Sequence, residues 1–199
     1  MKILRFAYIK KELMGTVVNL LLSLQKKSPE TFEHSIEVAN LSFGIGAHVG
    51  LSQDDMIDLY TAALLHDIGK LGIDKNILHC NHLTEEEIDE LRYSHIHKTY
   101  EILKSKGVED KILNIAYHHH ERLDGSGYPQ HLKANDLSEL DKILQVADTT
   151  SAIRMGRSYK EEASIEETET ILGKLAEKGT LETKYISAVV DVLDEDYMQ

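Results

Sequence analysis

The stretch His66-Asp67-Ile68-Gly69-Lys70 decides how the fold of this chain is interpreted, because it ends a helical segment on two potential metal ligands. Adjacent side chains on a continuous helix point about 100° apart, which makes it hard for them to share an ion. At a helix end that unwinds toward Gly69, both side chains can face one cavity. Asp67 can then bridge two ions while His66 binds one of them. For the dipeptide alone, a capping Asp beside a core His is the simpler explanation.

Further imidazoles and carboxylates lie on other segments with helical patterning. These candidate ligands are Glu30, His34, His95, His119, His120 and Asp148. Asp148 is the hardest to explain without a metal, because it ends the apolar run ILQVAD, where an unpaired carboxylate is costly to bury. Ligands that converge from several helices are typical of metal-binding bundles. Mixed His and carboxylate ligation without cysteine favours iron, manganese or zinc in a cluster of two or three ions.

Several of these residues also have an ordinary structural explanation. Glu30 lies four residues before His34 on the same helical face, but a first-turn carboxylate is also favoured by the helix dipole. His95 lies in an apolar helical row, where a hydrogen-bonded core histidine is common. Lys70 either contacts phosphate oxygens of an anionic substrate or meets the free carbonyls at a helix end. His118 is the weakest candidate of the run His118-His119-His120.

The composition limits the class of protein. The chain has 199 residues, 42% of them hydrophobic, which suits one folded domain with a short N-terminal addition. Its net charge of −12 argues against binding polymeric nucleic acid, although bound divalent cations would still admit a small anionic substrate. Cys80 is the only cysteine, and no apolar run is long enough to span a membrane. We therefore expect a reducing, cytoplasmic location.

The pattern of apolar positions predicts an all-α fold, because no stretch alternates convincingly like a strand. Capping patterns at Ser52, Thr84 and Ser164 mark three helix starts. We also expect an amphipathic helix in residues 1–27, although this opening segment superficially resembles a signal peptide. The other expected helices cover residues 36–47, 54–65, 84–102, 111–120, 140–154, 164–175 and 184–193. A long turn-rich loop should follow His120.

Two motifs give a resemblance to a known family. Residues 66–70, HDIGK, together with residues 119–129, HHERLDGSGYP, resemble the HD-GYP subgroup of the HD phosphohydrolase superfamily. The match runs from about Ser28 to Tyr159 and includes His34-Ser35, His95 and the segment KILQVAD. It implies an HD-domain-type helical bundle over residues 28–199 with a polynuclear metal site in its interior. Residues 1–27 would then form a linker or a dimerisation element.

The resemblance also implies the reaction and the residues that perform it. The implied ligands of two or three iron or manganese ions are His34, His66, Asp67, His95, His119, His120 and Asp148, and Glu30 for a third ion. The implied substrate contacts are Lys70, Tyr128, Arg157 and Lys160. The implied activity is hydrolysis of cyclic di-GMP to pGpG, GMP or both. Asp67 would orient or deprotonate the nucleophile, and Lys70 would neutralise the phosphate oxygens.

The sequence departs from the family pattern at three places. The family's second Asp after Asp148 is Ser151 here, Arg157 is followed by Ser158 where the family has Pro, and the C-terminal motif is reduced to Gly179-Thr180. Loss of a group that supports a ligand lowers metal affinity about 10- to 100-fold. One alternative is therefore a weakly active or inactive signalling module that binds a cyclic dinucleotide or a protein partner. Another is an HD phosphohydrolase for a different nucleotide.

The glycine-rich loop has two interpretations. Gly125 and Gly127 can adopt positive φ in a tight turn, with Tyr128 packed as a lid. The resemblance instead suggests that this loop offers a surface to partners such as a diguanylate cyclase domain. The N-terminal helix in turn allows either a homodimer or attachment to a sensory domain. The residues leave these choices open.

Overall fold

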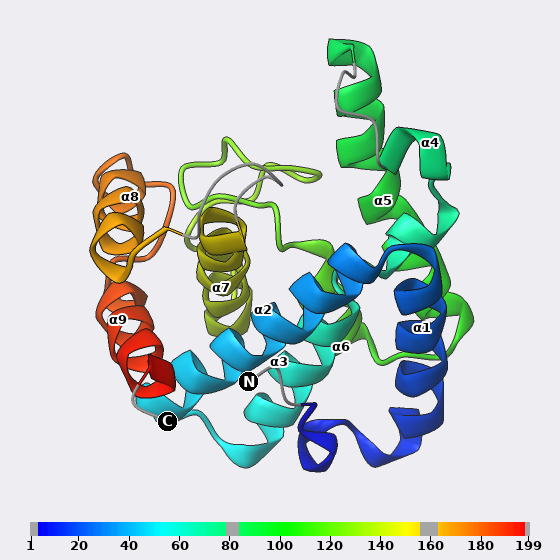
Figure 1. The fold of residues 1–199 in the computed structure, drawn as a ribbon, viewed down its shortest axis with the longest axis horizontal. Helices are drawn as coiled ribbons and strands as arrows, with labels where there is room; N and C mark the ends of the chain where they lie inside the picture. The colour runs from blue at the N-terminus through cyan, green and yellow to red at the C-terminus, as the bar shows by residue number, and fades with distance from the viewer. Residues whose placement is uncertain (1–3, 79–83, 156–162, 198–199) are drawn as a thin grey trace.

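The computed structural model describes residues 4–78, 84–155 and 163–197, and every regular element in these ranges is a helix (Figure 1). The predicted all-α fold is therefore confirmed. The elements are the 3₁₀ turns η1 (Phe6–Tyr8), η2 (Lys11–Leu13) and η3 (Ile68–Gly72) and the helices α1 (Met14–Lys27), α2 (Pro29–His48), α3 (Gln53–Leu65), α4 (Lys75–Leu78), α5 (Glu85–Ser105), α6 (Asp110–Tyr117), α7 (Glu139–Met155), α8 (Ile165–Glu177) and α9 (Lys184–Tyr197).

The three predicted helix starts are confirmed by their hydrogen bonds. The Ser52 side chain accepts a bond from the Asp55 amide at the start of α3. Thr84 and Ser164 each form a reciprocal capping box with the glutamate three residues later, at the starts of α5 and α8. These bonds satisfy amide groups that the first turn of a helix leaves without partners.

Two helix ends shape the candidate site. The α3 helix ends at Leu65 and continues into η3, so the chain unwinds at His66 and Asp67 as predicted. The helix expected over residues 111–120 is wrong at its C-terminal end, because α6 stops at Tyr117. Beyond it, the Glu121 amide bonds the His118 carbonyl and forms a tight turn. Both paired ligand motifs therefore lie just outside a helix.

The core is built around α2 and α3, which pack against each other, with α7 and α9 also packed against α2 (Figure 1). The N-terminal α1 contacts α2, α3 and η3, and it buries Val17, Leu21 and Leu24. Burying a large aliphatic side chain is worth roughly 1.5–3 kcal/mol. The α1 helix thus belongs to the packed body, while its role as a linker or dimerisation element stays a prediction.

The α5 helix lies directly against the turn that carries His66 and Asp67. A side chain at Gly69 would place its Cβ 1.9 Å from the His95 carbonyl oxygen and 2.5 Å from the Thr99 nitrogen. The Thr99 hydroxyl accepts a bond from the Gly69 amide and donates one to the His66 carbonyl. Glycine is required at this position because two backbone segments touch.

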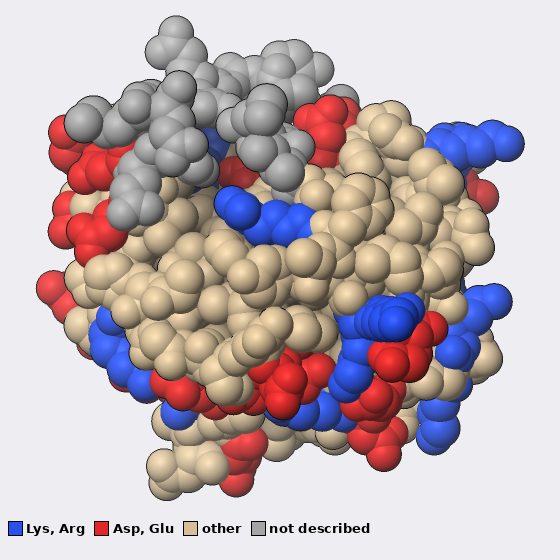
Figure 2. Space-filling model, turned by 90° about the horizontal axis from the view of Figure 1, so that it is seen from below, with Lys and Arg blue, Asp and Glu red and all other residues tan. Residues whose placement is uncertain are grey.

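Figure 2 shows how charged side chains are distributed over one face of the molecule. On the face drawn in Figure 2, Lys and Arg side chains are interspersed with Asp and Glu, and the described residues there form no continuous basic area. Among the helices in the described part of the chain, none combines the length and the apolar character needed to cross a membrane.

Candidate metal centre

Five segments of the fold bring seven predicted ligands into one interior cluster. These ligands are His34 of α2, His66 and Asp67 after α3, His95 of α5, His119 and His120 after α6, and Asp148 of α7. Their ligand atoms form overlapping groups of three, each within 4.8 Å. The groups are His95, His119 and His120; His34, His66 and Asp148; and His66, Asp67 and His119. Because the first two groups have no residue in common, the arrangement fits more than one ion.

Each oxygen atom of the Asp67 carboxylate faces at least one imidazole. Its Oδ1 is 3.6 Å from His95 Nε2 and 4.0 Å from His119 Nε2. Its Oδ2 is 3.5 Å from His66 Nε2. A carboxylate whose two oxygens face different imidazoles could hold two ions, and the bridging role expected for Asp67 stays a prediction.

Asp148 occupies the corresponding position on the other side of His66. Its Oδ1 is 3.0 Å from His34 Nε2 and 3.8 Å from His66 Nε2. Its Oδ2 is 3.8 Å from His120 Nδ1. This carboxylate is buried on α7 among apolar residues, so the cluster explains why the run ILQVAD ends in an acid.

Three buried imidazole nitrogens in the cluster have no hydrogen-bond partner among the described residues. They are the Nε2 atoms of His66, His95 and His119. In each ring the other nitrogen, Nδ1, donates to a backbone carbonyl. The acceptors are the carbonyls of Ala63, Leu91 and Ala116, at 2.7, 2.8 and 2.7 Å. This pairing leaves the Nε2 lone pairs pointing inward, as in metal-binding histidines. Burying a polar atom without a hydrogen-bond partner costs about 1–3 kcal/mol. Three such atoms in one interior therefore fit a site for divalent cations.

The electrostatics of the cluster also suit metal binding. Burial lowers the pKa of the imidazoles of His66, His95, His119 and His120, the last to about 3. Burial opposes ionisation of Asp67, but the charge of Lys70 and the surrounding imidazoles hold its pKa well below the ordinary value. These four imidazoles are therefore neutral, and Asp67 is ionised, at neutral pH. Metal ions need their ligands in these protonation states.

His34 is held at both ring nitrogens. Its Nε2 bonds Asp148, and its Nδ1 lies 3.0 Å from the hydroxyl of Ser151. Burial lowers the pKa of His34, but the bond and charge of Asp148 outweigh this and raise it. Ser151, the departure from the family pattern, is fully buried and still supports a candidate ligand. Its position three residues after Asp148 on one helical face could have indicated this contact.

The remaining predicted site residues occupy the rim or lie elsewhere. Lys70 Nζ is 2.5 Å from Asp67 Oδ2, and the ring of Tyr128 is centred 4.9 Å from that of His120. Glu30 is exposed on the first turn of α2 and belongs to none of the close groups, so its role as a ligand stays a prediction. Arg157 and Lys160 lie outside the described residues, as does Cys80.

Glu121 holds the glycine-rich loop, a role that the sequence analysis missed. Its carboxylate is fully buried and accepts bonds from the amides of Gln130, at 2.6 Å, and Leu132, at 2.9 Å. The positive φ expected for Gly125 is confirmed at 83°. The same expectation is wrong for Gly127, where glycine is required because a Cβ would lie 2.4 Å from the Glu121 backbone. The one indication of this role in the sequence was that Glu121 directly follows the histidine pair.

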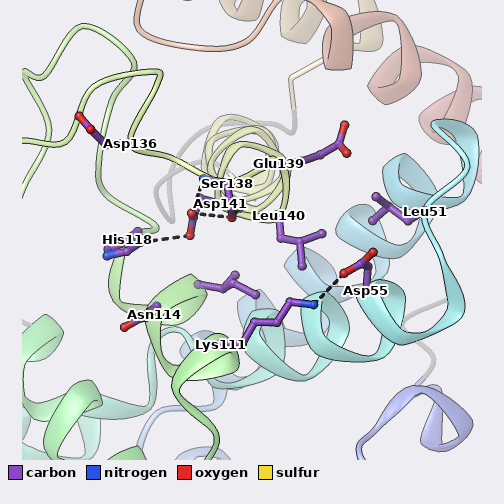
Figure 3. Close-up of a pocket in the computed structure, with 11 residues that line it drawn as sticks. Leu51, Asp55, Lys111, Asn114, His118, Asp136, Ser138, Glu139, Leu140 and Asp141 are labelled. Carbon is purple, nitrogen blue, oxygen red and sulfur yellow. Dashed lines mark hydrogen bonds and ion pairs between the residues drawn. The ribbon is translucent and has the colours of Figure 1, made fainter.

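His118 faces a different part of the molecule. It lines a cavity of about 430 Å³ between α3, α6 and the start of α7, and none of the seven clustered ligands lines that cavity (Figure 3). Its Nδ1 bonds Asp141 at 3.2 Å, and its Nε2 bonds Gln130 at 3.1 Å. The cavity's cation, Lys111, pairs with Asp55. This cavity is therefore separate from the metal centre.

Comparison with known proteins agrees with this geometry. Residues 18–180 match the family model described as HD domain. The chain therefore belongs to the HD domain family, the class of helical proteins that its fold and its His and Asp cluster define. The family inferred from the HDIGK and HHERLDGSGYP motifs is confirmed.

Curated relatives resemble the chain over part of their length. It is 30% identical over 181 residues to 3'3'-cGAMP-specific phosphodiesterase 1 of Vibrio cholerae, covering 90% of this chain and 42% of the relative. It is 38% identical over 153 residues to a cyclic di-GMP phosphodiesterase of Thermotoga maritima, covering 73% of this chain and 41% of the relative. The chain thus spans less than half the length of these relatives.

A solved structure supports the fold. The HD domain of the L. monocytogenes phosphodiesterase PgpH, in complex with cyclic-di-AMP, superposes with a TM-score of 0.69. The match covers 91% of this chain and 98% of that one, at 20% sequence identity. At this identity the likeness confirms the HD-type arrangement of helices.

Proposed function

We propose that this chain is a metal-dependent phosphodiesterase that hydrolyses cyclic di-GMP to pGpG, GMP or both. The observation that carries the proposal is the set of three unpaired, inward-pointing Nε2 atoms around the ionised Asp67. A cluster with such ligands suits hydrolytic chemistry on phosphate esters. The curated relatives named as cyclic di-GMP and 3'3'-cGAMP phosphodiesterases support the substrate class.

The residues present fit two or three divalent ions, with iron or manganese favoured by the mixed His and carboxylate ligands. Such ions, when bound, polarise phosphoryl oxygens and lower the pKa of water. The clustered imidazoles and the two carboxylates would hold them, and Glu30 would serve a third ion one helical turn before His34. This proposal gives each unpaired imidazole nitrogen a partner.

The chain's own side chains supply the remaining functions. Asp67 is ionised, so it can orient the attacking nucleophile by accepting a hydrogen bond from it. Lys70 lies at the rim with its side chain 25% exposed, so its ammonium group can contact non-bridging phosphate oxygens. Tyr128, half-buried against His120, covers the cluster and limits the access of water. Arg157 and Lys160 would add phosphate contacts from the segment after α7.

A second candidate is the hydrolysis of another cyclic dinucleotide, favoured by the relative named as specific for 3'3'-cGAMP. A third is a weakly active signalling module, favoured by the neutral Ser151 beside His34. Both candidates use the same metal centre and differ in the bound nucleotide or in the rate of turnover. Partners such as diguanylate cyclase or sensory domains, and a homodimer through residues 1–27, belong with the signalling candidate.

One experiment separates these candidates. The protein is purified without oxygen, its metal content is measured, and cyclic di-GMP, 3'3'-cGAMP and cyclic di-AMP are each offered as substrate. We expect two or three ions per chain and conversion of cyclic di-GMP to pGpG or GMP. Faster conversion of 3'3'-cGAMP would select the second candidate. Full metal occupancy with nucleotide binding and no turnover would select the signalling module.

A further inference from the structure

A line of aromatic rings connects the metal centre with the protein surface. The ring of Tyr128 is centred 4.9 Å from that of His120, and the ring of Tyr93 is centred 5.0 Å from that of Tyr128. Tyr93 lies on α5 and is 41% exposed. Tyr128 belongs to the glycine-rich loop, so two separate elements meet at this pair.

Backbone contacts hold both elements in place. The α5 helix lies against Gly69 and is bonded to the His66 turn through Thr99. The loop is held by the Tyr128 amide, which donates to the His120 carbonyl, and by the buried carboxylate of Glu121. The backbone segments that carry the two tyrosine rings are therefore held in place before any ligand binds. A preorganised aromatic surface loses little entropy on binding.

Exposed aromatic side chains are common on protein surfaces, so exposure alone says little about Tyr93. Its position is more informative. Of the exposed large hydrophobic residues in the described part of the chain, Phe6 and Leu22 lie on the N-terminal elements and Ile171 lies on α8. Tyr93 continues directly from a residue that contacts a candidate ligand. Its ring is centred 5.0 Å from that of Tyr128 at a tilt of 47°, and 41% of the residue is exposed to solvent.

We propose that Tyr93 and Tyr128 form a stacking platform for one purine base of the substrate. Neither of the two sequence motifs includes Tyr93 or gives it a role. The inference rests on the proposed function, because the base would be that of a cyclic dinucleotide whose phosphate lies at the metal centre. A ribose alone separates the base of a nucleotide from its phosphate. Two ring-to-ring steps of about 5 Å separate His120 from the exposed end of the platform. The platform therefore lies where the base would extend.

Stacking of a base on an aromatic side chain gives an expected magnitude. Removing such a ring weakens binding by roughly 5- to 150-fold in single-stranded nucleic acid complexes. The effect should fall on KM for a dinucleotide substrate, with kcat and metal content unchanged. It should be absent for a phosphodiester without a base, because such a substrate contacts the cluster alone.

The test compares Tyr93→Ala and Tyr93→Phe with the wild type on cyclic di-GMP and on an abasic analogue of it, a cyclic phosphodiester of two riboses that lacks both guanines and any other aromatic ring. Phe6→Ala is the matched control, because it removes a 53% exposed aromatic ring from η1. We expect Tyr93→Ala to raise KM for cyclic di-GMP by roughly 5- to 150-fold and to leave hydrolysis of the base-free ester unchanged. Tyr93→Phe and Phe6→Ala should both behave like the wild type.

Two results would overturn the platform. An unchanged KM for Tyr93→Ala would show that no base stacks on this ring. An equal loss on both substrates would show that Tyr93 only supports the loop. Because the chain contains no tryptophan, Tyr93→Trp adds a direct binding measurement. Saturable quenching of its fluorescence by a non-hydrolysable phosphorothioate analogue of cyclic di-GMP supports stacking, and the absence of quenching rejects it.

The same titration separates failure of the platform from failure of the proposed function. If the wild type hydrolyses neither cyclic di-GMP nor the base-free ester, the phosphodiesterase proposal fails. Titration of Tyr93→Trp with cyclic di-GMP itself then decides the platform, since binding needs no turnover. If quenching appears only with a protein partner added, the aromatic pair is a docking surface for that partner and the base-stacking role is rejected.

Discussion

His118 and His119 are neighbours in the chain but differ in every contact that their rings make. His118 lines the cavity of Figure 3, where Asp141 and Gln130 bond its two ring nitrogens. His119 is fully buried in the metal centre, with Nδ1 bonded to a backbone carbonyl and no partner for Nε2 among the described residues. Histidines of the first kind are satisfied by the protein itself. Those of the second kind are satisfied only by a ligand.

The charge states of the two rings differ in the same way. Burial lowers the pKa of His118, but the hydrogen bond and charge of Asp141 outweigh it and raise the value. Burial and the neighbouring imidazoles hold the pKa of His119 well below its usual range. One ring is therefore suited to an ion pair and the other to a metal. The comparison separates His118, whose ring is satisfied by the protein, from His119, whose Nε2 is left for an ion.

The largest expected effect compares the carboxylates of the two regions. Asp67→Ala removes a carboxylate that lies within 4.0 Å of four imidazoles, so we expect turnover to fall to background and bound metal to decrease. Asp141→Ala removes the partner of His118, and it should lower stability by about 1–3 kcal/mol while the metal content stays normal. Metal analysis, a hydrolysis assay and chemical unfolding measure the two variants. Near-normal hydrolysis by Asp67→Ala would reject this site.

The next effect compares the two histidines directly. Manganese at about 1,000 times its Kd should stabilise the wild type by about 4 kcal/mol. That corresponds to a rise in Tm of roughly 8–16 °C for a chain of this size. His118→Ala should keep this metal-dependent rise, and His119→Ala should lose most of it. Thermal unfolding with manganese and with a chelator gives the four values needed. Equal rises in both variants would remove the distinction between the two rings.

A smaller effect concerns the support of His34. Ser151→Ala removes the hydroxyl that contacts His34 Nδ1, and it should weaken metal binding about 10- to 100-fold. Thr150→Val is the matched control, because it removes a buried hydroxyl that bonds the Val146 carbonyl on the same helix. Competition with a fluorescent chelator measures both affinities. If the two variants bind metal equally well, Ser151 does not support the ligand.

The smallest effect lies far from both regions. Ser164→Ala removes the cap of α8 and should lower the free energy of unfolding by about 1 kcal/mol. Metal affinity should not change, because no candidate ligand lies on α8. Chemical unfolding together with the chelator competition checks both statements. A lower metal affinity in this variant would show that the stability of α8 is coupled to the metal centre.

Local rules made much of the fold predictable from the sequence. The caps at Thr84 and Ser164 depend on residues three positions apart, so a short stretch of sequence contains the whole interaction. The end of α6 at Tyr117 was not predictable in this way, because no glycine or proline follows it before Gly125 and only the backbone turn at His118 interrupts the helix. Where this helix ends therefore depends on backbone contacts that the spacing of apolar residues does not reveal.

The candidate site shows a similar division. Asp148 was recognisable because an acid in an apolar run needs an explanation within that run. The other candidates were proposed because they lie on several helical segments, and the family resemblance then assigned them as ligands. The structure brings the seven clustered ones together. Tyr93 and Glu121 were missed because their contacts depend on how α5 and the glycine-rich loop meet. Such tertiary contacts leave no periodic pattern in a single sequence.

The bonds between ring nitrogens and nearby carbonyls have a consequence for how the metal centre assembles. In His66, His95 and His119 the acceptor carbonyl lies three or four residues earlier, within the same turn of chain. Each ring is therefore oriented as soon as its own turn forms, independently of the other two. Packing of the helices against one another then only has to bring these oriented rings together. An ion can enter or leave the site without any rotation of the three rings.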